Sequence, residues 1–128
     1  MVPGIEAFYE LVANEMVKNI PSPWRQSRID AIFYPENSEY HGEYVSQSGK
    51  DRSFFVSDKV TRAIRDLRMR FKAAGQRVWG QLTFLLNPDG SFNVKWGYDS
   101  CDENGDTIWD PEEWSRQDKA RSERLTRE

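Results

Sequence analysis

The sequence predicts an α+β fold: an antiparallel sheet of about four to five strands carries an N-terminal helix and a central helix on one face, and a third helix follows at the C-terminus. Three observations support this prediction. Apolar residues recur at helical spacing over 5–20 and 60–74, they alternate at strand spacing over 82–98, and a turn sequence at 87–90 divides the alternating segment. With 128 residues, no repeat and no long linker, residues 1–128 are predicted to form a single domain.

The first half of the chain begins with an amphipathic helix that ends before Pro21 and Pro23, because proline lacks the amide proton that a helix needs. Residues 24–34 are rich in Ile, Phe and Tyr and predict a strand, which ends at the turn composition of 35–38. Further strands are predicted around 40–47 and at 54–56, with a turn at 48–51 between them. The apolar stripe of the helix consists of Ile5, Phe8, Leu11, Val12, Met16 and Ile20.

The central helix has the clearest pattern. Ser57 can cap its first turn and Gly75 can end it. One stripe of this helix is apolar and comprises Val60, Ile64, Leu67, Phe71 and Ala74. Basic side chains are expected to spread over its remaining surface, namely Lys59, Arg62, Arg65, Arg68, Arg70 and Lys72.

The segment 82–98 predicts a hairpin with one buried and one polar face, so we expect helices to cover only one side of the sheet. We assign five large residues of this region to the core, namely Trp79, Phe84, Phe92, Val94 and Trp96. The third helix is predicted to start near Pro111, since Asp110 can cap it and Glu113 can complete a capping box. Because few apolar residues follow, we expect the tail from about residue 115 to be mobile.

Composition narrows the classes of function. The net charge of −3 and the pI of about 5.3 argue against a protein that coats nucleic acids or anionic membranes. No apolar run is long enough to span a bilayer, and the N-terminal residues lack the pattern of a signal peptide, so we expect a cytoplasmic protein. The single cysteine, Cys101, cannot form an internal disulfide.

The most unusual segment runs from Tyr98 to Trp114 and contains seven acidic residues without one Lys or Arg. Large aromatic residues beside concentrated charge are typical of a protein-binding surface. A solvated acidic loop leading into a helix is the alternative interpretation. The acidic residues are Asp99, Asp102, Glu103, Asp106, Asp110, Glu112 and Glu113.

The order of these elements resembles the YezG-like immunity proteins, from about Phe8 through Trp114. The most specific parts are the sequence Trp-Gly-Gln-Leu-Thr-Phe at 79–84, the Asp-Gly-Ser-Phe at 89–92, and the Tyr-Asp at 98–99 with a later Asp-Pro. Members of this family are antitoxins of polymorphic or contact-dependent toxin systems. The resemblance implies a small α+β protein that binds and neutralises a toxin domain, commonly a nuclease. The strongly charged end beyond Ser115 departs from the family pattern.

A nuclease presents basic groups around its cleft, so an acidic immunity surface would complement it. We predict that the acidic residues steer and pair with the toxin, with Trp109 or Trp114 as a buried anchor. A core role for Trp109 is equally open at this point, as are active-site or neighbouring-surface inhibition and the oligomeric state. The predicted toxin-binding residues are Asp99, Asp102, Glu103, Asp106, Trp109, Glu112 and Trp114.

No catalytic residue, cofactor or resident metal is expected. His41 is the only histidine, and acidic neighbours disfavour a Cys101 thiolate. Asp102, Asn104, Asp106 and Glu113 have the spacing of a calcium loop, but its sixth position, which requires glycine, is Thr107.

The alternative function is a nucleic-acid or regulatory binding module. It would use the basic central helix and four C-terminal arginines, Arg116, Arg121, Arg124 and Arg127.

Overall fold

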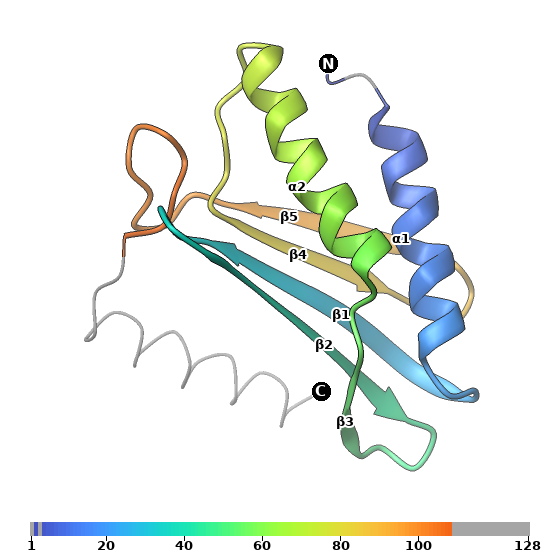
Figure 1. Ribbon diagram of the computed structural model, residues 1–128. Coiled ribbons are helices and arrows are strands. Elements are labelled where there is room, and N and C mark those ends of the chain that lie inside the picture. The colour runs from blue at the N-terminus through green and yellow to red at the C-terminus, as the bar shows by residue number, and fades with distance from the viewer. Residues whose placement is uncertain (1, 3, 109–128) are drawn as a thin grey trace.

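The computed structural model describes residues 2 and 4–108. In this part of the chain, two helices and a five-stranded sheet form an α+β fold, as predicted (Figure 1). The predicted third helix lies outside the described residues. The elements are α1 (Ile5–Asn19), β1 (Trp24–Phe33), β2 (Ser38–Ser46), β3 (Asp51–Phe54), α2 (Asp58–Ala73), β4 (Gln81–Leu86) and β5 (Phe92–Gly97).

The strands lie in the order β3-β2-β1-β4-β5, and every neighbouring pair is antiparallel. The register places Gly42, Ile29, Phe84 and Val94 in one row across four strands. Ile29 and Phe84 are fully buried, because this row faces the two helices. The helices therefore cover one face of the sheet, as the alternation of the hairpin predicted (Figure 1).

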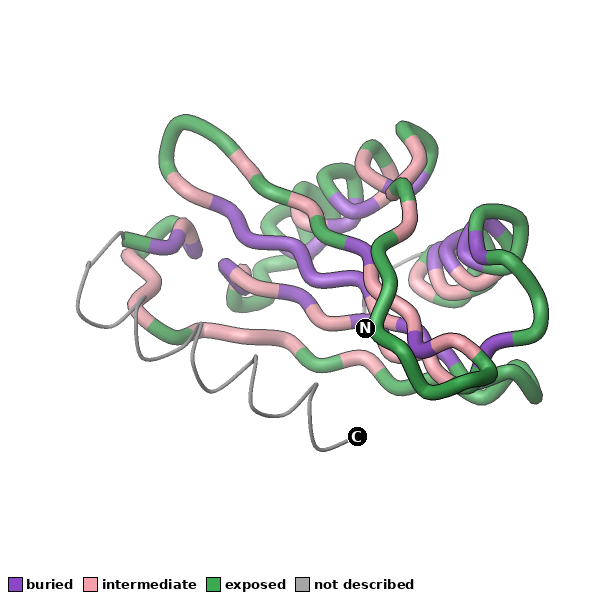
Figure 2. The backbone as a smooth tube through the Cα atoms, turned by 90° about the horizontal axis from the view of Figure 1, so that it is seen from below, coloured by how far each residue is buried: buried purple, intermediate pink, exposed green. Residues whose placement is uncertain are grey.

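Helix α1 presents Phe8, Val12 and Met16 to the sheet at a spacing of four residues, and all three are buried. Helix α2 does the same with Val60, Ile64, Leu67 and Phe71. Figure 2 shows the buried residues concentrated in the central strands and on the sides of the helices that face them.

Both predicted ends of α2 are confirmed. The Ser57 hydroxyl accepts the amide N–H of Val60 at 3.4 Å, and Gly75 follows the helix with a φ of 69°. The same Ser57 hydroxyl donates to Glu15 on α1 at 3.0 Å. The cap therefore also joins the two helices.

Two predictions in the sheet were wrong in detail. The third strand is Asp51–Phe54 rather than 54–56, and Phe55, which follows it, is 72% exposed. The core prediction for Phe92 is wrong: this residue is 44% exposed, because it begins an edge strand next to a turn. Its ring still stacks on Phe84 at 5.4 Å. Trp79 and Phe84 are fully buried as predicted, while Val94 and Trp96 are half-buried and pack against the core.

No helix in residues 4–108 is long and apolar enough to cross a membrane.

Candidate functional site

Four residues of the acidic run lie within the described chain: Asp99, Asp102, Glu103 and Asp106. They belong to one loop, residues 98–108, which we call the acidic loop. It leaves the end of β5 and returns to the end of β1, where the Thr107 N–H donates to the Phe33 carbonyl at 2.6 Å (Figure 1). Within the loop, Cys101 and Thr107 pair as an isolated antiparallel bridge, and the Ile108 N–H donates to the Ser100 carbonyl at 2.7 Å. The loop is therefore a small hairpin closed by its own backbone.

The Asp102 carboxylate organises the tip of the acidic loop. Its Oδ1 accepts the backbone N–H groups of Asn104 at 2.9 Å and Asp106 at 3.0 Å. The Asp102 N–H in turn donates to the Asp106 carbonyl at 2.8 Å. Aspartate commonly satisfies backbone donors of a turn in this way, so the Asp102 side chain stabilises the loop itself.

Arg68 of α2 holds the acidic loop against the body of the protein. Its Nε donates to the Trp79 carbonyl at 3.0 Å, and its Nη2 donates to the Gly105 carbonyl at 2.8 Å. The same Nη2 lies 3.3 Å from Asp106 Oδ1. The guanidinium stacks on the Phe33 ring, 4.2 Å from its centroid. A planar group with several donors suits this set of acceptors better than a lysine would.

The segment after α2 provides a second attachment. Gln81 Nε2 donates to the Asp99 carbonyl and to Thr107 Oγ1, both at 2.8 Å, and the Thr107 hydroxyl donates to the Gly80 carbonyl at 3.2 Å. Gly80 has no room for a side chain, because a Cβ atom there would meet Cys101 Sγ, and Thr107 Oγ1 at 2.6 Å. Gly80 and Gln81, which belong to the Trp-Gly-Gln-Leu-Thr-Phe sequence at 79–84, thus lie directly against the acidic loop.

The structure divides the four described acidic residues into two pairs. Asp102 and Asp106 are half-buried and form bonds within the protein, whereas Asp99 and Glu103 are exposed. Trp109, Glu112 and Trp114 lie outside the described residues. The four carboxylates thus belong to one loop, but two of them already have partners, and Lys72 and Arg77 lie beside the same loop.

Sequence reasoning missed Arg68, which it placed on the solvent side of α2. The side chain is only 15% exposed. A signal was present: Arg68 lies four residues after Ile64 and three before Phe71, so it belongs to the same helical face as these buried residues. A charged residue within an apolar stripe implies a partner across the interface.

His41 and Cys101 lie on different elements of the described chain. His41 Nε2 lies 2.5 Å from Glu43 Oε1 on β2, and Cys101 lies on the acidic loop. Among residues 2 and 4–108, no group of three or more His, Cys, Asp or Glu residues could hold a metal ion. Two residues of the calcium-loop spacing have contacts within the protein: the Asp102 carboxylate accepts backbone N–H groups and Asp106 contacts Arg68, while Glu113 lies outside the described residues.

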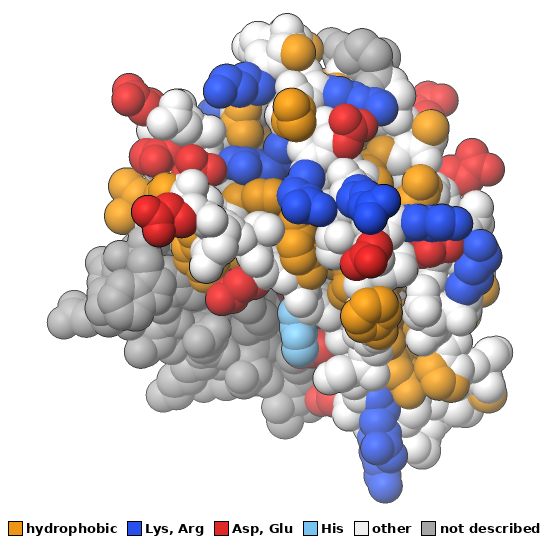
Figure 3. Space-filling view, in the orientation of Figure 1, with side chains coloured by type: hydrophobic (Ala, Val, Ile, Leu, Met, Phe, Trp, Pro, Cys, Tyr) orange, Lys and Arg blue, Asp and Glu red, His pale blue; other side chains and the backbone are white. Residues whose placement is uncertain are grey.

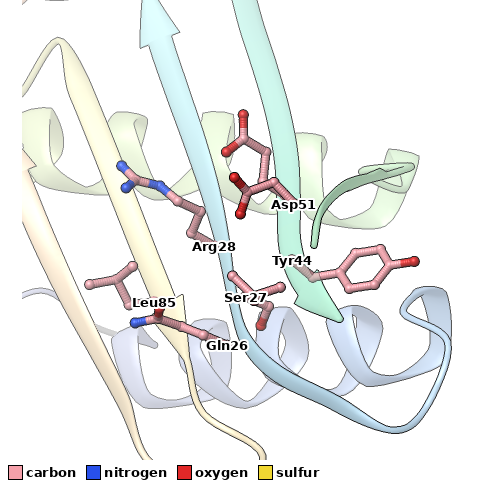
Figure 4. Close-up of a pocket in the computed structure, with 8 residues that line it drawn as sticks. Gln26, Ser27, Arg28, Tyr44, Asp51 and Leu85 are labelled. Carbon is pink, nitrogen blue, oxygen red and sulfur yellow. The ribbon is translucent and has the colours of Figure 1, made fainter. Parts of the chain in front are cut away.

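A small hollow on the sheet lies between β1 and its neighbours. Figure 4 shows Gln26, Ser27 and Arg28 of β1 beside Tyr44 of β2 and Leu85 of β4. It has about 10 Å³ of accessible space, which is enough for roughly one water molecule. This hollow cannot admit a small-molecule substrate.

Two comparisons with known proteins bear on the identity of the chain. No curated protein matches the chain. The family described as "Immunity protein YezG-like" matches residues 46–118, which is more than half of the 128 residues. The match contains α2 with Arg68, the segment with Gly80 and Gln81, and the whole acidic loop. On this evidence the chain belongs to the YezG-like family of immunity proteins.

Proposed function

We propose that this protein is the immunity protein of a polymorphic, contact-dependent toxin system, acting in the cytoplasm. It binds a cognate toxin domain, a nuclease, and neutralises it by protein–protein contact. The observation that carries the proposal is the match to an immunity family over the segment that builds and holds the acidic loop. The chemistry is complementary, because a nuclease must bind a polyanion and so presents cationic side chains around its cleft.

The geometry favours binding by the acidic loop because the loop is already ordered. Arg68 donates to the Gly105 carbonyl, and Gln81 donates to the Asp99 carbonyl and to the Thr107 hydroxyl. A surface that is ordered before binding loses less conformational entropy on association. The ordered loop therefore offers its exposed carboxylates in a fixed arrangement.

The acidic residues have two roles in this proposal. Asp99 and Glu103 are exposed and meet basic groups of the toxin, while Asp102 and Asp106 maintain the loop that presents them. Ile108, which is 53% exposed at the end of the loop, adds an apolar contact beside the charges. Glu112 contributes a further carboxylate to toxin binding, and Trp109 or Trp114 supplies the aromatic anchor that slow dissociation requires.

The direct test is co-purification with the C-terminal domain encoded by the gene immediately upstream. A nuclease assay of that domain is then run with and without this protein. A stable complex that silences cleavage supports the proposal. No complex and undiminished cleavage would reject it.

A charge reversal tests the acidic loop. We expect the double variant Asp99→Lys with Glu103→Lys to reduce the association rate with the toxin by about tenfold or more at low ionic strength. The effect should shrink as salt is added, because exposed charges are screened. Stopped-flow or surface-plasmon-resonance kinetics at several salt concentrations would measure it.

The double variant Glu6→Lys with Glu10→Lys provides the control, since it makes the same change in net charge at two exposed positions of α1, away from the loop. It should slow association by less than about threefold. An equal effect of the two variants would mean that net charge alone, and not the acidic loop, guides the encounter.

A further inference from the structure

A second surface of the protein has the opposite character from the acidic loop. Helices α1 and α2 lie side by side and antiparallel: Glu15 of α1 bonds to Ser57 before α2, and Gly4 lies against Arg70 near the end of α2. Between them runs an open groove with about 550 Å³ of accessible volume. Figure 3 shows Lys and Arg side chains gathered over this helical face, with apolar and acidic side chains among them.

The floor of the groove is apolar and shallow. Phe8 and Leu67 form its base and are almost fully buried, while Ala7 and Ala63 are too short to fill the space above them. Leu11 borders the groove and is 36% exposed. Such a floor gains contact area only if apolar side chains of another molecule enter it.

The rim of the groove is basic. Lys59, Arg62 and Arg70 line it, and Asp66 is the one acid among the lining residues. Asp66 is paired with Arg70 at 2.7 Å, whereas Arg62 has no ion-pair partner within the described part of the chain. The rim therefore carries a net positive charge above an apolar floor.

We propose that this groove binds an acidic amphipathic helix of a protein partner. The apolar side of such a helix would occupy the floor, and its carboxylates would meet Lys59 and Arg62, as in other complexes in which a helix docks in a groove. A nucleic acid fits less well, because its phosphate backbone would leave the apolar floor uncovered. The proposal does not depend on toxin neutralisation, since it concerns a different face of the molecule.

The test uses a designed peptide of about 16 residues that places Leu on one helical face and Glu on the other. We expect it to bind the full-length protein with a micromolar dissociation constant at low salt. A peptide of the same composition in scrambled order should bind at least about tenfold more weakly. NMR shift changes should centre on Phe8, Leu11 and Ala63.

Two matched variants separate the groove from general electrostatics. Arg62→Glu reverses a charge on the rim, while Arg65→Glu makes the same change at an exposed position of α2 that does not line the groove. We expect Arg62→Glu to weaken peptide binding by about tenfold or more and Arg65→Glu by less than about threefold. Because both positions are exposed, both variants should fold, which circular dichroism checks.

Several results would overturn the proposal. These are equal losses for the two variants, equal affinity for the scrambled peptide, or tighter binding of a single-stranded oligonucleotide than of the peptide. Self-association that Arg62→Glu abolishes would assign the groove to a second copy of this chain and would overturn it too.

Discussion

At the scale of single residues, Arg68 connects three parts of the fold that are distant in sequence. It bonds to Trp79 before β4 and to Gly105 of the acidic loop, and it stacks on Phe33 at the end of β1. A charged donor that is largely removed from water makes strong hydrogen bonds. If the donor is deleted, each buried acceptor that loses its bond lowers the free energy of unfolding. Arg68 is therefore a structural requirement for the loop that we propose to bind the toxin.

We expect Arg68→Ala to lower the free energy of unfolding by about 2–4 kcal/mol, because it leaves the Trp79 and Gly105 carbonyls and Asp106 without this donor. Arg65→Ala, at an exposed position of the same helix, should change it by less than about 0.5 kcal/mol. Urea denaturation of both variants measures the difference. If they are equally stable, the contacts of Arg68 contribute nothing net.

At the scale of elements, the acidic loop packs on the segment between α2 and β4. Gly105 has a φ of 84°, and a Cβ atom there would lie 2.6 Å from the Val78 carbonyl oxygen. Gly90, in the β4–β5 turn, has a similar φ of 91° but nothing within 4 Å of a Cβ position. A residue with a Cβ atom would therefore meet an unfavourable left-handed backbone at both positions, but it would meet a steric clash only at Gly105.

This pair allows a matched prediction. Gly90→Ala should cost about 1 kcal/mol, from the left-handed backbone alone. Gly105→Ala should cost roughly 1–3 kcal/mol more, because the loop must also move away from Val78. Thermal unfolding measures both costs, and hydrogen exchange of the Thr107 amide should rise only in Gly105→Ala. Equal costs would show that the loop yields freely and is not held by this contact.

The elements also show which features the sequence can predict. Both helices and the β4–β5 hairpin were predictable because local spacing determines which of their residues are buried. The bounds of β3 were not, since Phe54, Phe55 and Val56 are all apolar, and only pairing with β2 makes Asp51 the first and Phe54 the last strand residue. The acidic run was visible, but the partner of Asp106 lies 38 positions away in the chain, so only the folded structure distinguishes it from Asp99.

At the scale of the whole molecule, the acidic loop and the basic rim of the groove lie in different places, although Lys72 and Arg77 also lie beside the acidic loop. The acidic loop lies at the end of the sheet beside the start of β4, and the basic rim lies over the helices (Figures 1 and 3). The net charge of −3 does not reveal this arrangement, because it sums the charges of the whole chain. Composition alone therefore indicated only that general binding to polyanions is not expected.

The stability of the whole fold should depend on pH through Glu15, which joins the two helices. A hydrogen bond from Lys18 and a second from Ser57 lower the pKa of the Glu15 carboxyl from its ordinary value of 4.5. Because the folded pKa is lower than the unfolded one, the stabilisation is complete above the unfolded pKa. It is lost as the pH falls through the folded pKa.

We therefore expect Glu15→Gln to be less stable than the parent protein near neutral pH, and the difference to disappear at a pH below the folded pKa of Glu15. Glu10→Gln, at an exposed position of the same helix, should follow the parent at every pH. Urea denaturation at a series of pH values between about 3 and 7 tests this. A gap between Glu15→Gln and the parent that stays constant over that range would mean that the carboxylate charge does not hold α1 against the start of α2.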